Sequence, residues 1–333
     1  MPAPAKSVPH APRASISVIV PSYNAARFIG EALDSILAQT LQPEQIIVVD
    51  DGSSDGTAEV VLRHNDRRIQ YIRTEHAGVA SARNVGLDAA RCEYISFLDA
   101  DDRWRPIFLE MMHAFLSDDP TAASVFGNFV RFQHPSGELL GDQFRSYPEI
   151  KRPKLLEGAP YAHGRIPREK AFSALVACSD IPAYTQVMMF RRSMIEHLRF
   201  EPTLSLGEDT NFVLKAYLAG GVIFTDVVLA DVRRHDANAT RHPDEMVIHD
   251  LNGLKALAPH VTRESDLRAY RDRLIRAHID AAVYQARHGR VRAGLRTYRE
   301  TFSVPGSRWR KLKGSMRMAL CLPRGLASPN PTN

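Results

Sequence analysis

Three short apolar runs rich in β-branched residues, each followed at once by polar residues, constrain the fold of this chain most strongly. The runs span residues 16–20, 46–49 and 94–98. Apolar residues recur at helical spacing between them, over residues 57–63 and 78–90. Strands that alternate with helices predict an α/β fold with a mostly parallel central sheet. Because the carboxyl ends of parallel strands share one edge of a sheet, we expect the polar residues to converge there.

The pattern is less regular beyond these runs. Asn24 is expected to cap a first helix, whose apolar stripe includes Ile29 and Leu33. Prolines recur through residues 131–182, which favours an irregular and mobile insertion. The further elements expected are strands over residues 69–73, 187–190 and 223–232, a helix over 208–218, and mainly helical structure over 245–298.

The composition favours a folded, cytoplasmic protein. Hydrophobic residues make up 44% of the 333 residues and charged residues 24%, which is ordinary for a globular chain. Three widely separated cysteines suit neither a disulfide framework nor a zinc cluster. No apolar run reaches the roughly 20 residues of a membrane-spanning helix. Residues 1–14 lack the apolar core of a secretory signal, so we expect a disordered lead-in.

Charge is unevenly distributed along the chain, whose formal net charge is +5. Eleven of the 43 Lys and Arg residues, but one of the 38 acidic residues, lie between Arg287 and Arg324. That stretch therefore carries +10 and the remainder −5. A basic segment on an acidic body favours a local contact with an acidic surface over a general nucleic-acid-binding domain.

Acidic residues follow two of the three apolar runs. Asp99 and Asp101 follow one run, and Asp50 and Asp51 follow another. Carboxylates this close repel each other unless positive charge lies among them, and Mn²⁺ or Mg²⁺ bound to a phosphate group could supply it. A polar turn that caps the next helix would explain a lone Asp-x-Asp equally well. The two acidic strand ends together favour a metal and phosphate site.

Ordered motifs in the chain resemble those of family-2 glycosyltransferases of the GT-A fold, of the type that builds bacterial polysaccharide and lipopolysaccharide. The similarity is dense over residues 15–105, sparser over 183–240, where Gly207-Glu208-Asp209 contributes, and absent after that. The dense part contains ISVIVPSYN (16–24), IIVVDDGSSDGT (46–57), GVASARNVG (78–86) and FLDADD (97–102).

The resemblance implies a GT-A-like nucleotide-binding sandwich with a helical C-terminal region. We expect the insertion to shape the acceptor pocket and to become ordered when the donor binds. The expected parts are a lead-in (1–14), a GT-A domain (15–240) made of a donor half (15–130), the insertion (131–182) and an acceptor half (183–240), a helical region (241–304) and a basic tail (305–333).

The resemblance also implies a site for a nucleotide-diphosphate sugar, with UDP as the expected nucleotide. Asp99 would contact the ribose or a divalent metal, and Asp101 would bind the metal on the diphosphate. Arg83 would lie near the nucleotide, where a guanidinium gives directed hydrogen bonds, unless it forms a surface ion pair on its helix. The implied donor-binding residues are Pro21, Ser22, Tyr23, Asp51, Arg83, Asp99, Ala100 and Asp101.

A general base is implied on the acceptor side. Transfer to a hydroxyl requires removal of its proton while the bond to the diphosphate breaks, and one carboxylate can do this in a single displacement with inversion. Asp209 is the implied base, with Glu208 as the fallback. Both residues would also be explained as acids at a helix start, favoured there by the macrodipole.

Two further residues have two interpretations each. His235 resembles a histidine of the family that reaches the metal or the diphosphate, but an isolated histidine is usually a surface or core residue. Trp104 would pack near the acceptor pocket, or else in the core or an interface.

The basic tail contains RWRKLKGSMRMALCL over residues 308–322. Interleaved basic and apolar side chains suit a segment that lies on an anionic membrane surface, and lipid-linked acceptors are common in the family. The alternative is a solvated basic helix with part of one face packed on the body. Gly314 and Pro323 are expected to limit any continuous helix.

Three functions follow from these patterns. The first is an inverting, metal-dependent hexosyltransferase that moves a sugar from a UDP-sugar to a saccharide or lipid-linked acceptor, at the inner face of the membrane. A nucleotidyltransferase would also use strand-end carboxylates, but its phosphate loop rich in Gly and Lys or Arg is missing near the N-terminus. The third is a catalytically silent domain with a membrane- or nucleic-acid-binding tail. The carboxylate set and Asp209 count against a silent site, and the charge of the body counts against nucleic acid.

Overall fold

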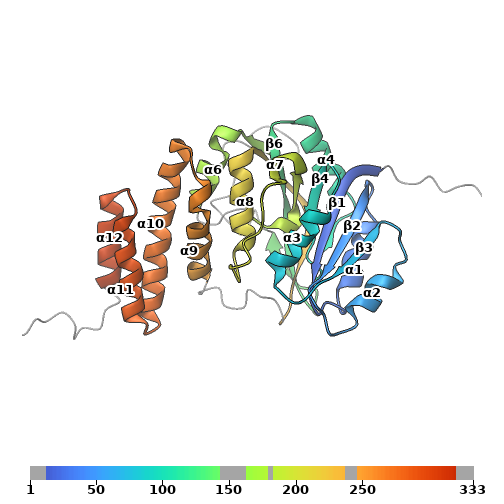
Figure 1. Cartoon of the computed structure of the whole chain (residues 1–333), viewed down its shortest axis with the longest axis horizontal. Helices are drawn as coiled ribbons and strands as arrows, with labels where there is room; N and C mark the ends of the chain where they lie inside the picture. The colour runs from blue at the N-terminus through green and yellow to red at the C-terminus, as the bar shows by residue number, and fades with distance from the viewer. Residues whose placement is uncertain (1–12, 143–162, 179–182, 237–245, 320–333) are drawn as a thin grey trace, which may run out of the picture.

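The predicted N-terminal strands form the parallel part of one ten-stranded sheet in the computed structural model, which describes residues 13–142, 163–178, 183–236 and 246–319 (Figure 1). The elements of this part are β1 (Arg13–Ser22), α1 (Ile29–Leu37), β2 (Gln42–Asp50), α2 (Thr57–Arg63), β3 (Ile69–Arg73), α3 (Val79–Ala89) and β4 (Tyr94–Phe97). The strands lie in the order β3-β2-β1-β4, and all three pairs are parallel. β4 is buried along its whole length, as expected for a strand inside a covered parallel sheet.

The second half of the sheet is mixed. Its elements are β5 (Arg103–Trp104), α4 (Phe108–Asp118), β6 (Ala122–Gln133), β7 (Leu139–Asp142), β8 (His163–Ile166), α6 (Arg168–Val176), β9 (Met188–Arg191), α7 (Arg192–Ile195) and β10 (Gly221–Arg234). β9 lies antiparallel between β4 and β6, and β10 runs parallel to β6. β5, β7 and β8 add short antiparallel pairs. The predicted α/β class is confirmed, with parallel pairing concentrated in the N-terminal half.

The prediction of an irregular insertion over residues 131–182 is wrong for its described parts. β6 continues across residue 130, so the predicted boundary falls inside a strand. β7 pairs with β6, β8 pairs with β10, and α6 buries Phe172 and Val176. Regular structure forms here because apolar side chains and free strand edges find partners elsewhere in the chain. Residues 143–162 and 179–182 lie outside the described residues.

Asn24 does not cap the first helix, because α1 begins at Ile29. Asn24 instead has a backbone φ of 47°, in the left-handed region. Its side-chain Oδ1 accepts a hydrogen bond from the backbone N–H of Ser54 at 2.9 Å. Asn tolerates this conformation better than most residues, and here it connects the loops after β1 and β2.

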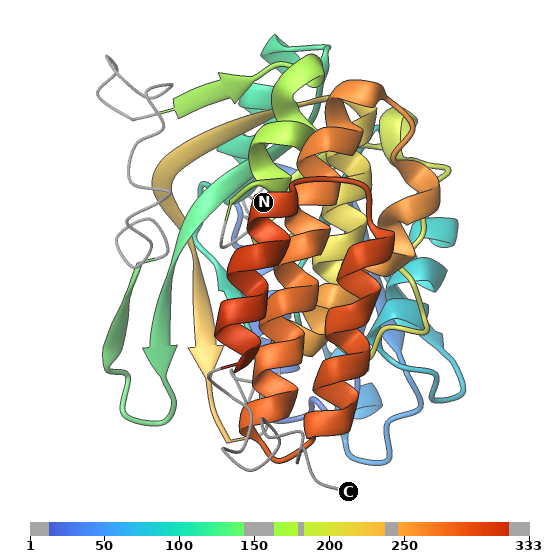
Figure 2. The same cartoon turned by 90° about the vertical axis from the view of Figure 1, so that its left-hand side faces the viewer.

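The C-terminal part is helical, as predicted, and forms a layered group at one end of the molecule (Figures 1 and 2). The elements are α8 (Glu208–Ala219), α9 (Met246–Leu257), α10 (Glu264–Arg287), α11 (Val291–Glu300) and α12 (Arg308–Ala319). The long α10 contacts α6 and α9 toward the sheet, and α11 and α12 away from it. Its outer side builds a separate apolar cluster that includes Ile275, Ile279, Tyr298 and Met318.

Gly314 lies inside α12, so the prediction that it limits the helix is wrong. An added Cβ at this position would lie 2.7 Å from Cδ1 of Ile279 and 3.2 Å from Cε2 of Tyr298. The glycine therefore permits α12 to pack closely on α10 and α11. This packing matches the predicted alternative of a basic helix with one face on the body, and Pro323 lies outside the described residues.

Candidate functional site

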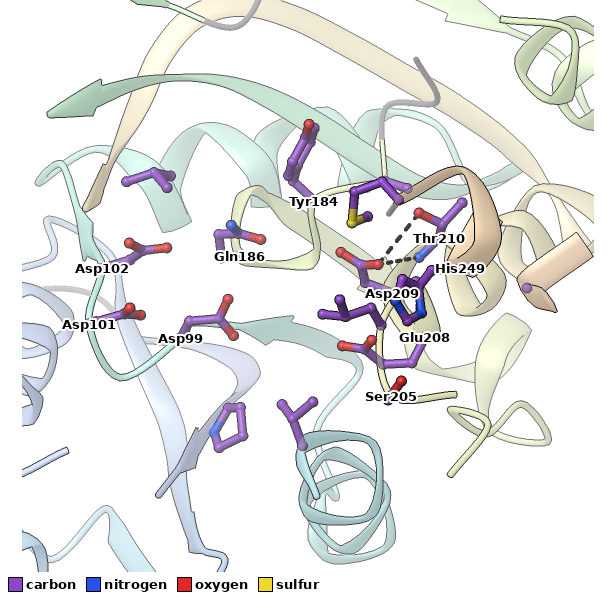
Figure 3. Close-up of a pocket in the computed structure, with 18 of the residues that line it drawn as sticks. Asp99, Asp101, Asp102, Tyr184, Gln186, Ser205, Glu208, Asp209, Thr210 and His249 are labelled. Atoms are coloured by element: carbon purple, nitrogen blue, oxygen red, sulfur yellow. Dashed lines mark hydrogen bonds between the residues drawn. The ribbon is translucent and has the colours of Figure 1, made fainter. Parts of the chain in front are cut away.

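A pocket of about 1540 Å³ lies between the carboxyl ends of the strands and the helical region (Figure 3). Its first side is formed by Pro21, Tyr23, Asp99, Ala100, Asp101 and His235, and we call it the sheet wall. Its second side is formed by Glu208, Asp209, His249, Asp250, Arg273 and Arg276 of α8, α9 and α10, and we call it the helix wall. The ends of β1 and β4 therefore converge at the pocket, whereas Asp50 and Asp51 at the end of β2 do not line it, and Asp209 faces the same pocket.

Two predicted donor-binding residues do not line the pocket. Ser22 is buried, and its hydroxyl donates to the carbonyl of Val49 at 3.4 Å. Asp51 is 2% exposed, and its carboxylate accepts hydrogen bonds from the backbone N–H groups of Ala77 and Gly78, both at 2.8 Å. Asp51 therefore shapes the loop that leads into α3.

Tyr23 lies where β1 ends and is half exposed. Its ring stacks on the imidazole of His76, with 4.1 Å between the ring centroids. Nδ1 of His76 lies 2.8 Å from Oδ2 of Asp51. An exposed aromatic face beside the strand ends can receive a flat ring such as a nucleotide base.

Asp99, Asp101 and Asp102 bring three carboxylates to the end of β4 (Figure 3). Burial and the charge of Asp99 raise the pKa of Asp101, while His235 opposes this shift. Burial and the charges of Asp101 and Asp99 raise the pKa of Asp102 well above its usual range. Both pKa values are raised, which indicates that added positive charge would be favourable at this end of the sheet.

Asp101 and His235 could bind a divalent cation together. Nε2 of His235 lies 3.0 Å from Oδ2 of Asp101, so small rotations would turn both atoms toward one ion. Among the described residues, no three His, Cys, Asp or Glu side chains are placed to hold a metal ion. Two protein ligands fit Mn²⁺ or Mg²⁺ when a diphosphate and water complete the coordination, as is usual for Mg²⁺.

Arg83 connects the two walls. Its guanidinium lies 2.9 Å from Oδ1 of Asp99 and 2.7 Å from Oε1 of Glu208. The residue is 4% exposed, which excludes the surface ion pair considered from the sequence. The nearby carboxylates raise its pKa against the opposing effect of burial, so the guanidinium stays charged.

Glu208 and Asp209 begin α8 but have different environments. Gly207 before them has a φ of 81°, a left-handed conformation that favours glycine, and this turn directs the first helical residues into the pocket. Glu208 is buried and paired with Arg83. Oδ1 of Asp209 accepts a hydrogen bond from the backbone N–H of Thr210 at 2.6 Å. Burial and the charge of Glu208, partly offset by Arg83, raise the pKa of Asp209 to about 7.

Trp104 occupies the core. It is 4% exposed, stacks on Phe108 with 4.1 Å between centroids, and its Nε1–H donates to the carbonyl of Gln186 at 2.7 Å. Of the positions considered from the sequence, near the acceptor pocket or in the core or an interface, the structure shows the core position. Trp104 holds the segment that presents Gln186 to the pocket.

Sequence reasoning missed several lining residues, namely Asp102, Tyr184, Gln186, His249 and Arg276. Asp102 belongs to the acidic motif at the end of β4 and could have been included on that signal. The others lie outside the dense motifs, singly and without a diagnostic spacing. Only the packing of η2 (Thr185–Val187), α9 and α10 brings them to the pocket.

Strand-end carboxylates face a helix-start carboxylate across the pocket, which is the arrangement that the resemblance to family-2 glycosyltransferases implies. A family model described as Glycosyl transferase family 2 matches residues 17–198. The match covers more than half of the chain, so the chain belongs to this family.

Curated relatives support the assignment. The glycosyltransferase GlyA of Streptococcus pneumoniae is 29% identical over 258 residues, which are 74% of this chain and 34% of the relative. WfgD of Escherichia coli, a UDP-Glc:alpha-D-GlcNAc-diphosphoundecaprenol beta-1,3-glucosyltransferase, is 39% identical over 138 residues, which are 40% of this chain and 54% of the relative. The chain thus spans about a third to half of the length of these relatives.

Solved structures confirm the predicted GT-A-like fold. Residues 1–349 of Staphylococcus aureus TarS, in complex with UDP, superpose with a TM-score of 0.60 at 17% identity, covering 92% of each chain. The mannosyltransferase PcManGT of Pyrobaculum calidifontis, in complex with GDP-Man and Mn²⁺, gives a TM-score of 0.55 at 19% identity, covering 94% of this chain and 82% of the other. Within the described residues, no helix has the length and apolar character to cross a membrane.

Proposed function

We propose that this glycosyltransferase moves a hexosyl group from a UDP-sugar to a hydroxyl group, with inversion, and that Asp209 is the general base. The observation that carries the proposal is the difference in partners between Glu208 and Asp209 at the start of α8. Glu208 is held by Arg83 at 2.7 Å, whereas Asp209 forms no ion pair within the described residues and accepts a hydrogen bond from the backbone N–H of Thr210. Asp209 is thus the carboxylate of the helix wall that is left to take a proton from an acceptor.

The sheet wall would bind the donor. Tyr23 offers a face for the base, and Pro21 and Ala100 line the same wall. Asp99 is oriented by Arg83 and could contact the ribose. UDP as the nucleotide is supported by WfgD, a UDP-Glc-dependent glucosyltransferase, and by TarS, which was solved with UDP, whereas PcManGT was solved with GDP-Man. Ser22 and Asp51 would act from beneath the pocket by fixing its loops.

Asp101 and His235 would hold Mn²⁺ or Mg²⁺. When bound, the metal would stabilise negative charge on the leaving diphosphate. The chain's own contribution is to place these two side chains beside the donor and to keep the acidic strand end ready for a cation. The raised pKa of Asp101 is consistent with that preference.

One general base is enough to account for the proton, the new bond and the leaving group in the transfer step. The acceptor oxygen forms a bond to the anomeric carbon as the bond from that carbon to the diphosphate oxygen breaks. The acceptor proton passes to Asp209, whose pKa near 7 suits a base that works close to neutrality. Attack opposite the leaving group inverts the anomeric configuration.

The acceptor would be a saccharide, free or lipid-linked, and the enzyme would work at the inner face of a membrane. Leu312 and Met316 on α12 and Phe302 beside it are more than half exposed among basic residues. Exposed apolar side chains among Lys and Arg suit the boundary of an anionic membrane. WfgD transfers glucose to alpha-D-GlcNAc-diphosphoundecaprenol, a lipid-linked acceptor, which supports the same acceptor class.

A thermal-shift panel tests the donor and the metal. Nucleoside diphosphates and their sugars are added with Mn²⁺, Mg²⁺ or chelator to the wild-type chain and to Asp101→Asn. A ligand that binds the native state raises the melting temperature, so we expect a metal-dependent rise with UDP that Asp101→Asn removes. No rise with any nucleotide would favour the silent domain. Release of pyrophosphate from a nucleoside triphosphate would favour a nucleotidyltransferase.

A further inference from the structure

The pocket continues past Asp209 along α9 and α10. His249 and Asp250 of α9 line this extension, together with Arg273, Arg276 and Asp280 of α10 (Figure 3 for His249). Residues 273, 276 and 280 recur at helical spacing and share one face of α10. The sequence motifs shared with known glycosyltransferases end before this helix, and the proposed base and donor residues lie outside it.

The carboxylates around Arg276 already have guanidinium partners. Asp250 lies 2.8 Å from Arg273, and Asp272 lies 3.4 Å from Arg310. Asp280 lies 2.8 Å from Arg317. Two of these partners, Arg310 and Arg317, come from α12, so the basic helix neutralises acids of α10 that would otherwise compensate Arg276.

Arg276 itself has no carboxylate partner among the described residues. One terminal nitrogen donates to the carbonyl of Ala177 at 3.0 Å, and its buried Nε has no hydrogen-bond partner in the described part of the chain. Nε of Arg273 is also buried without a partner there. Burial and the positive charges of Arg273 and Arg310 lower the pKa of Arg276 against the effect of the nearby acids. The guanidinium is partly exposed and lines the pocket, so its remaining N–H groups can donate to an anion there.

We propose that Arg276, with Arg273 beside it, binds a phosphate group of the acceptor. A guanidinium fork matches phosphate oxygens in charge and geometry. The subsite lies on the helix wall with Asp209, which would set the distance between the phosphate and the reacting hydroxyl. α12 packs along the neighbouring face of α10 through Gly314 and Ile279, so the same helix group carries both the phosphate subsite and the exposed basic surface. This inference rests on the proposed function and deepens it.

The test measures binding with the donor site filled. The full chain is saturated with UDP and Mn²⁺, then titrated calorimetrically with hexose 1-phosphates, the matched methyl hexosides, hexuronates and inorganic phosphate. We expect a hexose 1-phosphate to bind at least tenfold more tightly than its methyl hexoside and than inorganic phosphate. If inorganic phosphate bound as tightly as the hexose 1-phosphate, the Arg276 subsite would be a site for free phosphate. If a hexuronate bound more tightly than the hexose 1-phosphate, the subsite would be a site for carboxylates. Either result would overturn the proposal.

Variants of one helix locate the subsite. Arg276→Gln should remove the preference for the phosphate, Arg276→Lys should retain part of it, and UDP binding should stay unchanged in both. Arg271→Gln is the matched control, because Arg271 lies on α10 outside the pocket lining and pairs with Glu264 at 3.7 Å. Unchanged phosphate binding in Arg276→Gln, or displacement of UDP by the hexose phosphate, would overturn the proposal. Failure of UDP itself to bind would instead contradict the proposed donor.

Discussion

The helix wall of the pocket and the loops beneath its sheet wall hold acidic side chains in different ways. In these loops, backbone groups from neighbouring motifs hold the carboxylates of two acids that do not line the pocket: Ser53 N–H donates to Asp50, and Ala77 and Gly78 N–H donate to Asp51, all at 2.8 Å. On the helix wall, guanidinium groups from distant elements hold them. Arg83 pairs with Glu208, 125 positions away. The loops beneath the sheet wall are therefore organised by short motifs, whereas the helix wall depends on tertiary packing.

Asp209→Asn should give the largest effect, because it removes the base from the helix wall while the sheet wall stays intact. We expect kcat to fall by about 10²–10⁴-fold, the usual contribution of general base catalysis. The affinity for UDP with Mn²⁺ should not change. Steady-state kinetics and a UDP titration measure both quantities. Asp88→Asn, at an exposed position of α3, is the control. Equal loss of UDP binding in Asp209→Asn would show that this residue is not specific to the acceptor side.

Arg83→Met should break the connection between the walls. Two carboxylates, Asp99 and Glu208, would lose their buried partner, and breaking such an ion pair costs about 3–5 kcal/mol. Urea unfolding of the variant and the wild type measures the difference in unfolding free energy. Arg63→Met, at an exposed position of α2, should change it by less than about 0.5 kcal/mol. A similar loss of unfolding free energy in both variants would mean that the ion pairs of Arg83 with Asp99 and Glu208 do not stabilise the fold more than a surface arginine does.

Gly314→Ala tests the packing of α12, which depends on no motif. The added Cβ would lie 2.7 Å from Ile279, and overpacking of this kind costs about 1–3 kcal/mol. Thermal unfolding should show the loss, and UDP binding should be retained because the sheet wall is remote. Met316→Ala on the exposed face of the same helix is the control. A stabilised Gly314→Ala would mean that helix propensity outweighs the close contact.

The pH dependence of kcat sharpens the assignment of the base. Burial and Glu208 raise the pKa of Asp209 to about 7, and the base must be ionised to accept a proton. The rate should therefore fall about tenfold for each pH unit below that value and level off above it. A profile at saturating substrates, over roughly pH 5 to 9, measures this. Arg83 lowers the pKa, so Arg83→Met should move the limb to higher pH. A flat profile through neutrality would contradict the assignment.

Leu312→Ser combined with Met316→Ser should give the smallest effect. Removal of two exposed apolar side chains from α12 should weaken sedimentation with anionic phospholipid vesicles several-fold. Neutral vesicles should bind neither protein, and the melting temperature should stay within a degree or two. Equal sedimentation of the variant and the wild type would show that Leu312 and Met316 do not contribute to membrane binding.

Prediction from the sequence succeeded where the signal was local. The runs that became β1, β2 and β4 are apolar and rich in β-branched residues, and α2 and β3 lie at the predicted residues. It failed where a partner lay far away. Prolines suggested irregular structure over residues 131–182, yet β8 gained a partner in β10. Asn24 suggested a helix cap, yet its side chain was needed by the loop after β2.

By itself, the sequence determined the α/β class, the acidic strand end that carries Asp99 and Asp101, and the family, because each depends on residue type and spacing within short segments. Only the tertiary structure decided which acid of Glu208 and Asp209 remained available, since that depends on Arg83 reaching across from α3. The same holds for Trp104 in the core and for Arg276 on the helix wall. The sequence gives the charge and shape of each side chain. The partner of Glu208, however, is set by the packing of elements more than a hundred residues apart.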